Sequence, residues 1–108
     1  MENQNNILEC GQNLEESIDF EFYKTLFDPV RSEILKFLAT QGKKNITEIA
    51  KNFTQDRSVI SRHLELMNRY GILNKEKQNR STFYELNKEL ILEKFEVTTS
   101  NLKRLIQQ

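Results

Sequence analysis

The sequence predicts a mainly helical α+β protein that forms one small domain. Two observations support this prediction. Apolar residues recur at helical spacing through most of the chain, and the period changes from 3.6 to 2 residues after Gly71. A length of 108 residues fits a single domain with a modest core. We therefore expect residues 15–108 to form that domain, and residues 1–14, rich in Asn and Gln, to be a flexible tail.

The first expected helix is the segment Glu15–Phe27. Its apolar side chains recur four residues apart at Ile18, Phe22 and Leu26, with further aromatic residues beside them. This arrangement gives more apolar surface than a small domain easily covers by itself. The excess indicates a partner subunit, with burial in the domain's own core as the alternative.

Two shorter helices are expected next, over Val30–Thr40 and Thr47–Phe53. Asp28 is suited to cap the first of them. Pro29 fits its first turn because proline lacks the N–H that would stay unpaired there. Thr47 is expected to cap the second helix. A short polar connector joins the two.

The periodicity of Asp56–Gly71 predicts a helix of about four turns with two different faces. The carboxylate of Asp56 is expected to accept hydrogen bonds from the first turn, and Gly71 can adopt the left-handed conformation that ends a helix. The turn Thr54–Gln55 joins this helix to the preceding one, as in a helix-turn-helix. The apolar face comprises Val59, Ile60, His63, Leu64, Leu66, Met67 and Tyr70. The polar face comprises Arg57, Ser58, Ser61, Arg62, Glu65, Asn68 and Arg69.

Two strands and a last helix complete the expected elements. Ile72–Lys77 and Thr82–Leu86 alternate in the manner of strands, and a polar, basic loop joins them. This hairpin is suited to lie along a nucleic-acid backbone or to enter a minor groove. Asn87 can cap the last helix, Lys88–Ile106, in which the weak helix formers Val97–Ser100 allow a bend or a break.

Charge is unevenly distributed, although the formal net charge is zero. Met1–Asp28 carries one basic residue against seven acidic ones, whereas Pro29–Arg80 carries eleven basic residues against five acidic ones. The remaining segment, Ser81–Gln108, has four of each. A solvated mixture of charges is one interpretation, but segregation this sharp favours a functional basic face.

Other features of the composition favour a cytoplasmic protein. No apolar run has the length of a membrane span, and no secretory signal is expected at the acidic N-terminus. The single cysteine, Cys10, cannot form an internal disulfide. We expect neither a membrane partner nor a cofactor.

The polar face of Asp56–Gly71 brings short hydroxyls and long cations together near the start of a helix. Such a face can donate hydrogen bonds to phosphates and to base edges in a major groove. A solvated polar face is the alternative, but the position between a short helix and a basic hairpin favours double-stranded DNA as the partner. The candidate DNA-binding residues are Gln55, Arg57, Ser58, Ser61 and Arg62 in the helical part, and Lys75, Lys77, Asn79 and Arg80 in the hairpin.

Two neighbours of this face have different expected roles. His63 lies on the apolar side, where a packing role is favoured over a phosphate contact from the helix edge; it stays a candidate DNA-binding residue. Glu65 points toward the DNA side, where its carboxylate would repel phosphates. It either accepts a hydrogen bond from a cytosine amino group or lies clear of the DNA.

Six short stretches follow one another along the chain: Asp28-Pro29-Val30-Arg31, Ile34-Leu35-Lys36-Phe37-Leu38, Glu48-Ile49-Ala50, Ser61-Arg62-His63-Leu64, Tyr70-Gly71-Ile72-Leu73 and Tyr84-Glu85-Leu86-Asn87. In this order, over about Leu26 to Asn87, they resemble the ArsR/SmtB-type winged helix-turn-helix repressors. The resemblance implies an α-α-α-α-β-β-α chain that dimerises through its first and last helices and represses transcription from a palindromic operator. The expected dimer residues are Ile18, Phe22, Leu26, Leu92, Phe95, Leu102 and Leu105.

The chain departs from this family's pattern in two places. The Cys-x-Cys pair of metal-sensing members is replaced by Asn45-Ile46-Thr47, and the last helix has no histidine, so we expect no transition-metal site. The turn before the reading helix usually has Gly then Leu, whereas this chain has Thr54–Gln55. A non-glycine residue in a left-handed conformation would be strained, so the turn is expected to be built differently.

Three further hypotheses stay open at this point. No spacing of nucleophile and base, and no Gly-rich phosphate loop, supports catalysis, so an enzyme is not expected. A winged-helix adaptor that binds protein instead of DNA is one alternative. A redox-responsive regulator acting through Cys10 is another, with a free surface thiol as the simpler interpretation of that residue.

Overall fold

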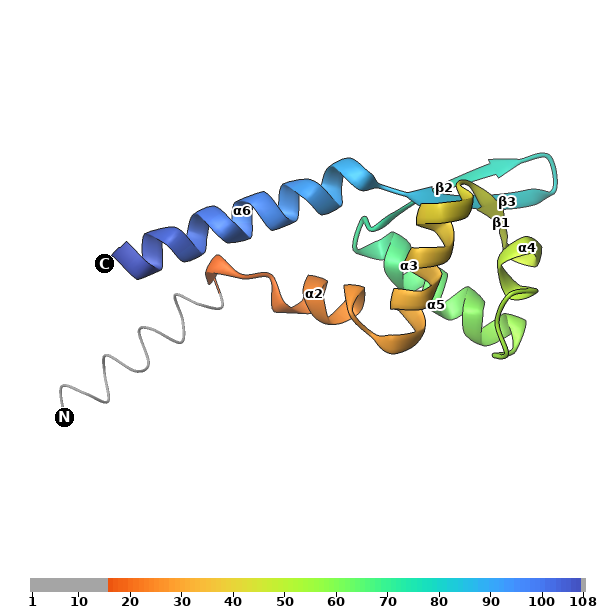
Figure 1. The fold of residues 1–108 in the computed structure, drawn as a ribbon. Coiled ribbons are helices and arrows are strands. Elements are labelled where there is room, and N and C mark those ends of the chain that lie inside the picture. The colour runs from red at the N-terminus through yellow and green to blue at the C-terminus, as the bar shows by residue number, and fades with distance from the viewer. Residues whose placement is uncertain (1–15, 108) are drawn as a thin grey trace.

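The computed structural model describes residues 16–107, and the expected tail with Cys10 lies outside the described residues. The helices of the middle of the chain lie on one side of a small sheet, and one long C-terminal helix extends away from the tip of the hairpin (Figure 1). The elements are α2 (Phe20–Leu26), α3 (Pro29–Gln41), β1 (Lys44–Asn45), α4 (Ile46–Ala50), α5 (Arg57–Arg69), β2 (Leu73–Gln78), β3 (Ser81–Leu86) and α6 (Lys88–Gln107). This confirms the mainly helical α+β fold.

One apolar core joins these elements. The stripe Ile60, Leu64 and Met67 gives α5 a fully buried face, because positions i, i+4 and i+7 lie on one side of a helix. The same core takes Ile34 and Leu38 from α3. Its other buried apolar members are Phe22, Leu26, Ile49, Ile72, Leu73 and Tyr84. The core therefore fixes the orientation of α5, and the polar face of α5 remains at the surface.

The first helix is shorter than the periodicity predicts. Glu16 and Ser17 have helical conformation, but the chain breaks at Ile18, and α2 starts at Phe20. Asp19 causes the new start, since its side chain accepts a hydrogen bond from the backbone N–H of Phe22 at 3.1 Å. The single helix predicted over Glu15–Phe27 is therefore wrong in its N-terminal part.

The predicted cap of α3 is confirmed. Asp28 Oδ2 accepts hydrogen bonds from the N–H groups of Val30 and Arg31, at 3.1 and 3.2 Å. Pro29 occupies the first turn. Thr40 lies near the end of the helix, and its hydroxyl donates to carbonyls of the preceding turn.

The predicted cap of α4 is wrong. The N-cap is Asn45, and its side chain accepts from the N–H of Glu48 at 2.8 Å, while the Glu48 carboxylate accepts from the Asn45 N–H at 3.0 Å. This reciprocal pair satisfies two N–H groups at once, whereas Thr47 would satisfy one. The connector before it also forms a short strand, β1, that was not expected.

The three strands form an antiparallel sheet in the order β1-β3-β2. The hairpin predicted from the change of period is confirmed, with Lys75 opposite Tyr84 and Gln78 opposite Ser81. Its tight turn places Asn79 at φ 57°, a conformation that asparagine tolerates better than most residues. This hairpin is the wing of the fold.

Gly71 ends α5 as predicted. Its φ is +78°, its N–H donates to Asn68 O at 3.0 Å, and the N–H of Ile72 donates to Met67 O at 2.9 Å. These two bonds define a Schellman motif, which turns the chain directly from the helix into β2. Gly71 therefore determines where the wing begins.

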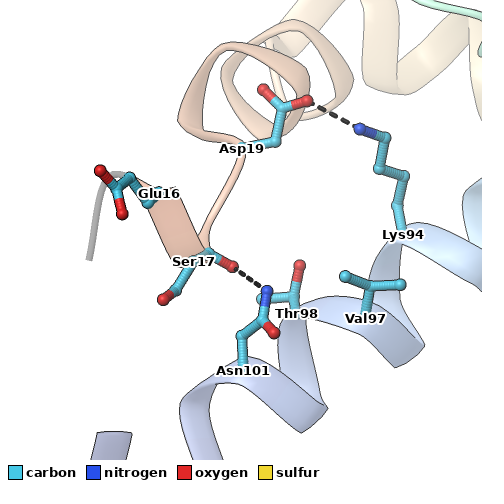
Figure 2. A pocket seen from close by; sticks show the side chains of 7 residues that line it. All are labelled: Glu16, Ser17, Asp19, Lys94, Val97, Thr98 and Asn101. Atoms are coloured by element: carbon cyan, nitrogen blue, oxygen red, sulfur yellow. Dashed lines mark hydrogen bonds and ion pairs between the residues drawn. The ribbon is translucent and has the colours of Figure 1, made fainter. Parts of the chain in front are cut away.

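The long helix α6 is fixed to the N-terminal part of the described chain (Figure 2). Lys94 Nζ donates to Asp19 at 2.8 Å, and the side-chain amide of Asn101 donates to Ser17 O at 2.9 Å. Tyr23 adds a hydroxyl bond to Lys94 O at 2.9 Å. These contacts place α2 beside α6, on the side of the molecule away from the wing (Figure 1).

The start of α6 matches the prediction, and its middle does not. Asn87 Oδ1 accepts from the N–H of Leu90 at 3.2 Å, as expected of a cap. The helix continues without interruption through Val97–Ser100, where a bend or a break was expected. The hydroxyl of Thr99 donates to Phe95 O at 2.8 Å, so this residue satisfies its polar group without leaving the helix.

Candidate nucleic-acid interface

The reading helix α5 follows α4 after a short connection, and the two helices pack on each other. Asp56 is the N-cap by its backbone, and its carbonyl accepts from the N–H groups of Val59 and Ile60, at 2.9 and 3.0 Å. Its side chain makes no capping hydrogen bond and is exposed. The predicted carboxylate cap is therefore wrong, and the N–H groups of the first turn have no bond from it.

The outward face of α5 contains the candidate DNA-binding residues that are most exposed to solvent. Arg57, Ser58 and Arg62 are exposed, and Ser61 is half-buried beside them. Gln55, in the turn before the helix, is also half-buried. The three exposed residues lie in the first half of the helix, where its N–H groups also favour a negative partner. The structure thus brings the expected reading residues together on one surface.

The turn that positions α5 contains no left-handed residue. Within residues 16–107, Asn79 is the only non-glycine residue with a positive φ. The turn at Thr54–Gln55 therefore avoids the strain that its sequence would otherwise suffer, in agreement with the expectation of a different construction.

Glu65 does not project freely toward the DNA side. Its Oε1 accepts a hydrogen bond from Lys75 Nζ at 2.7 Å and from the Tyr84 hydroxyl at 2.9 Å. These two hydrogen bonds, Lys75 first, hold the pKa of the Glu65 carboxyl below its usual value. Burial, followed by the hydrogen bond to Glu65, raises the pKa of the Tyr84 phenol. Sequence reasoning placed Glu65 on the polar face but missed both partners.

The wing carries the other cationic candidates. Lys77, Asn79 and Arg80 are exposed at its tip, where the strands turn. Lys75 is nearer the body and is paired with Glu65. On the opposite face of the sheet, Glu76 accepts from Lys43.

His63 faces the interior of the subunit. It is half-buried, and its Nδ1 lies 3.2 Å from a terminal nitrogen of Arg31, on α3. Burial is the main reason why the pKa of His63 lies below its usual value, and the Arg31 charge adds to it. This position favours the packing role over a phosphate contact.

The residues expected at a dimer interface divide into two groups. Phe22 and Leu26 are 0% and 3% exposed in the single chain, so they belong to its core and offer no surface to a partner. Leu92 and Phe95 on α6 are 60% and 41% exposed. The other three, Ile18, Leu102 and Leu105, are half-buried. Phe27 is 63% exposed, but it was not among the expected dimer residues, because it lies outside the four-residue spacing that begins at Ile18.

Residues 16–107 contain no group of three or more His, Cys, Asp or Glu side chains that could hold a metal ion; Cys10 lies outside that range. None of the helices in the same range is long and apolar enough to cross a membrane.

This arrangement of α4, α5 and a hairpin defines a winged helix-turn-helix DNA-binding protein. The model of the bacterial regulatory proteins of the arsR family matches residues 28–75. An uncharacterized HTH-type transcriptional regulator of Methanocaldococcus jannaschii is 33% identical over 64 residues, which are 59% of this chain and 72% of that protein. The chain therefore belongs to the arsR family of transcriptional regulators, which bind DNA and are not enzymes.

Solved structures agree with this assignment. The crystal structure of a possible transcriptional regulator for arsenical resistance has a TM-score of 0.64 at 25% identity, over 78% of this chain and 91% of that chain. The transcriptional repressor PagR of Bacillus anthracis has a TM-score of 0.58 at 29% identity, over 64% of this chain and 78% of that chain. The resemblance inferred from the six sequence stretches is thus confirmed.

Proposed function

We propose that this chain is a homodimeric, cytoplasmic transcriptional repressor that binds a palindromic operator and does not sense transition metals. The observation that supports it best is the exposed polar face of α5 beside a cationic wing. In this proposal Arg57, Ser58 and Arg62 enter the major groove, with Gln55 and Ser61 at the edge of the contact. Lys77, Asn79 and Arg80 lie along the backbone next to it.

Dimerisation in this proposal uses the side of the molecule away from the wing. Phe27, Leu92 and Phe95 are exposed there, and an apolar groove of about 250 Å³ lies beside them, lined partly by Leu35 and Ile91. An exposed apolar surface of this kind is costly in water and is suited to a self-complementary contact. A two-fold dimer would place the two α5 helices in half-sites about one helical turn, roughly 34 Å, apart.

Repression follows from occupancy of the operator by such a dimer, since a bound dimer excludes polymerase from an overlapping promoter. The structural neighbour PagR is named a transcriptional repressor. The proposal that metals are not sensed is supported by the donor set, because a site of nitrogen and sulfur ligands needs several convergent His or Cys side chains. The only histidine, His63, is engaged by Arg31.

The experiment is a selection of genomic fragments that the purified protein binds, followed by titration of the recovered duplex at several salt concentrations. The proposal expects an inverted repeat, steep weakening with salt, and less transcript from a promoter that contains the repeat. Binding without sequence preference, or a rise in transcript, would contradict it. A panel of divalent transition metals added to the titration should leave the affinity unchanged.

A further inference from the structure

We propose that Glu65 is a positioning residue that fastens the wing to the reading helix, and that it withholds Lys75 from the DNA backbone. This inference rests on the proposed function, because it assigns which wing cations meet phosphate. We call the set of Glu65, Lys75 and Tyr84 the wing latch. Arg80 and Lys77 are then the wing's phosphate contacts.

The register of the hairpin creates the wing latch. Lys75 and Tyr84 are directly opposite each other on β2 and β3, so their side chains leave the same face of the sheet. Both donate to one and the same oxygen, Oε1 of Glu65. One carboxylate on α5 therefore joins both strands of the wing to the helix. A shift of the register by one residue would put Lys75 and Tyr84 on opposite faces of the sheet, where they could not share one acceptor.

The burial of Tyr84 makes this contact specific. The residue is 2% exposed, and the hydroxyl of a buried tyrosine needs a partner. Its acceptor is on the surface of α5 and not within the sheet, so the ring fills the core while its hydroxyl reaches the boundary between helix and wing. Lys75 donates the second hydrogen bond at the surface, where its side chain is 39% exposed and that of Glu65 is 46% exposed.

The wing latch also solves an electrostatic problem. Glu65 lies one turn beyond Arg62 on the DNA side of α5, where a free carboxylate would repel phosphate. Pairing with Lys75 offsets that repulsion, and the charge of Lys75 is then not available to a phosphate. Counterion release should then come from the cations at the wing tip, and Lys75 should add little to the salt dependence.

The experiment compares Lys75→Gln, Glu65→Gln and the double variant on the selected operator, with affinity measured over a range of salt concentrations. Lys75→Gln leaves the carboxylate without its positive partner, so affinity should fall by about tenfold, which is about 1.4 kcal/mol. The double variant should return to within about threefold of wild type, because no unpaired carboxylate remains and an amide oxygen at the position of Glu65 can still accept the hydrogen bond from Tyr84 that holds the wing. Lys36→Gln, which breaks the exposed pair with Glu33 on α3, is the control for loss of one positive charge.

A direct contact between Lys75 and phosphate would give a different result. If Lys75 contacts phosphate itself, its removal lowers the salt slope by about 0.9 for each subunit, and the double variant stays as weak as the single one. Under the wing latch the salt slope of Lys75→Gln stays close to that of wild type.

A second measurement needs no DNA and therefore separates failure of the wing latch from failure of the proposed function. Carbon-detected NMR gives the pKa of the Glu65 carboxyl in the free protein. Tyr84→Phe keeps the buried ring and removes only the donor, so it should raise that pKa, and Lys75→Gln should raise it further. An unchanged pKa in both variants, with unaltered circular dichroism, would overturn the wing latch even if operator binding is normal.

Discussion

Arg31 donates a hydrogen bond to the Nδ1 atom of His63, at 3.2 Å, and so links the start of α3 to the middle of the reading helix. A guanidinium has no acceptor, so Nδ1 must carry the lone pair and the imidazole proton must be on Nε2. Arg31 also donates from Nε to Thr25 O, the end of α2, at 2.7 Å, and pairs with Asp28. The side chain of Arg31 thus connects α2, α3 and α5 and helps to fix the orientation of α5.

The first prediction concerns pH. Protonation of His63 would place an N–H opposite the Arg31 guanidinium, with Arg62 also near and only Asp28 in opposition. The folded pKa lies below the ordinary value of 6.5, so between the two values the unfolded chain binds more protons. Stability should therefore fall as pH falls through 6.5 toward the folded pKa. Thermal unfolding between about pH 7.5 and 5.5 measures this loss.

His63→Gln provides the control, because its side-chain oxygen can still accept from Arg31 and does not titrate in this range. The melting temperature of the variant should change less over the same interval than that of wild type. Glu65 contributes a separate loss at lower pH: its folded pKa is lowered from 4.5, so its stabilisation is lost as pH falls through that lowered value. Equal pH dependence of the two proteins above pH 5.5 would contradict the role of His63.

The second prediction concerns Arg62, which is exposed on the reading face of α5. Arg62→Ala should weaken operator binding by at least about tenfold and relax sequence preference at one position of each half-site, because a bidentate guanine contact is worth roughly 1–3 kcal/mol. The melting temperature should not change. Arg69→Ala is the matched control: it removes the same charge from an exposed position about 10 Å further along the same helix. Equal effects of both variants would show that charge alone matters.

Much of this fold follows from local sequence signals, and the exceptions have physical causes. The caps at Asp28 and Asn87 and the stop at Gly71 depend on the residue itself and its nearest neighbours, and all three are confirmed. The strand β1 escaped prediction because two residues carry no period; it exists because β3 is present to pair with it. The α4 cap could have been found, since Asn45 and Glu48 have the spacing of a capping box.

The site divides in the same way. Helical spacing was sufficient to place Arg57, Ser58 and Arg62 on one face, because that face depends only on α5. The partners of Glu65 and His63 come from other elements, ten or more residues away in sequence, and no local pattern indicates them. Burial of Phe22 was also beyond reach, because apolar spacing alone does not distinguish a core face from an interface.

The third prediction uses the two glycines with positive φ. Gly71 and Gly42 have φ values of +78° and +79°, where a non-glycine residue is strained, and Gly42 combines this with ψ −161°, a conformation that is essentially confined to glycine. A Cβ at Gly42 would meet nothing within 4 Å, whereas at Gly71 it would lie 2.7 Å from a terminal methyl of Leu90. That methyl can shift, so Gly71→Ala should cost about 1–2 kcal/mol, mainly from backbone strain, and Gly42→Ala should cost more, because of its ψ value. Chemical denaturation of both variants measures the difference, and a larger loss at Gly71 than at Gly42 would contradict this assignment of the strain.

The last prediction tests the proposed dimer through Leu92, an apolar residue of α6 that is 60% exposed. Leu92→Glu adds a charge to the proposed contact, where it would be buried without a partner, so sedimentation should show monomers at concentrations at which wild type is dimeric. Operator affinity should then fall by at least about a hundredfold, because each monomer binds its half-site alone. Ser100→Glu is the control: it adds the same charge to an exposed position of α6, about 80° around the helix from Leu92 and about 140° from Phe95, and should leave the dimer intact. A monomeric wild type would contradict the proposed dimer directly. Dimers that survive Leu92→Glu would move the contact away from α6.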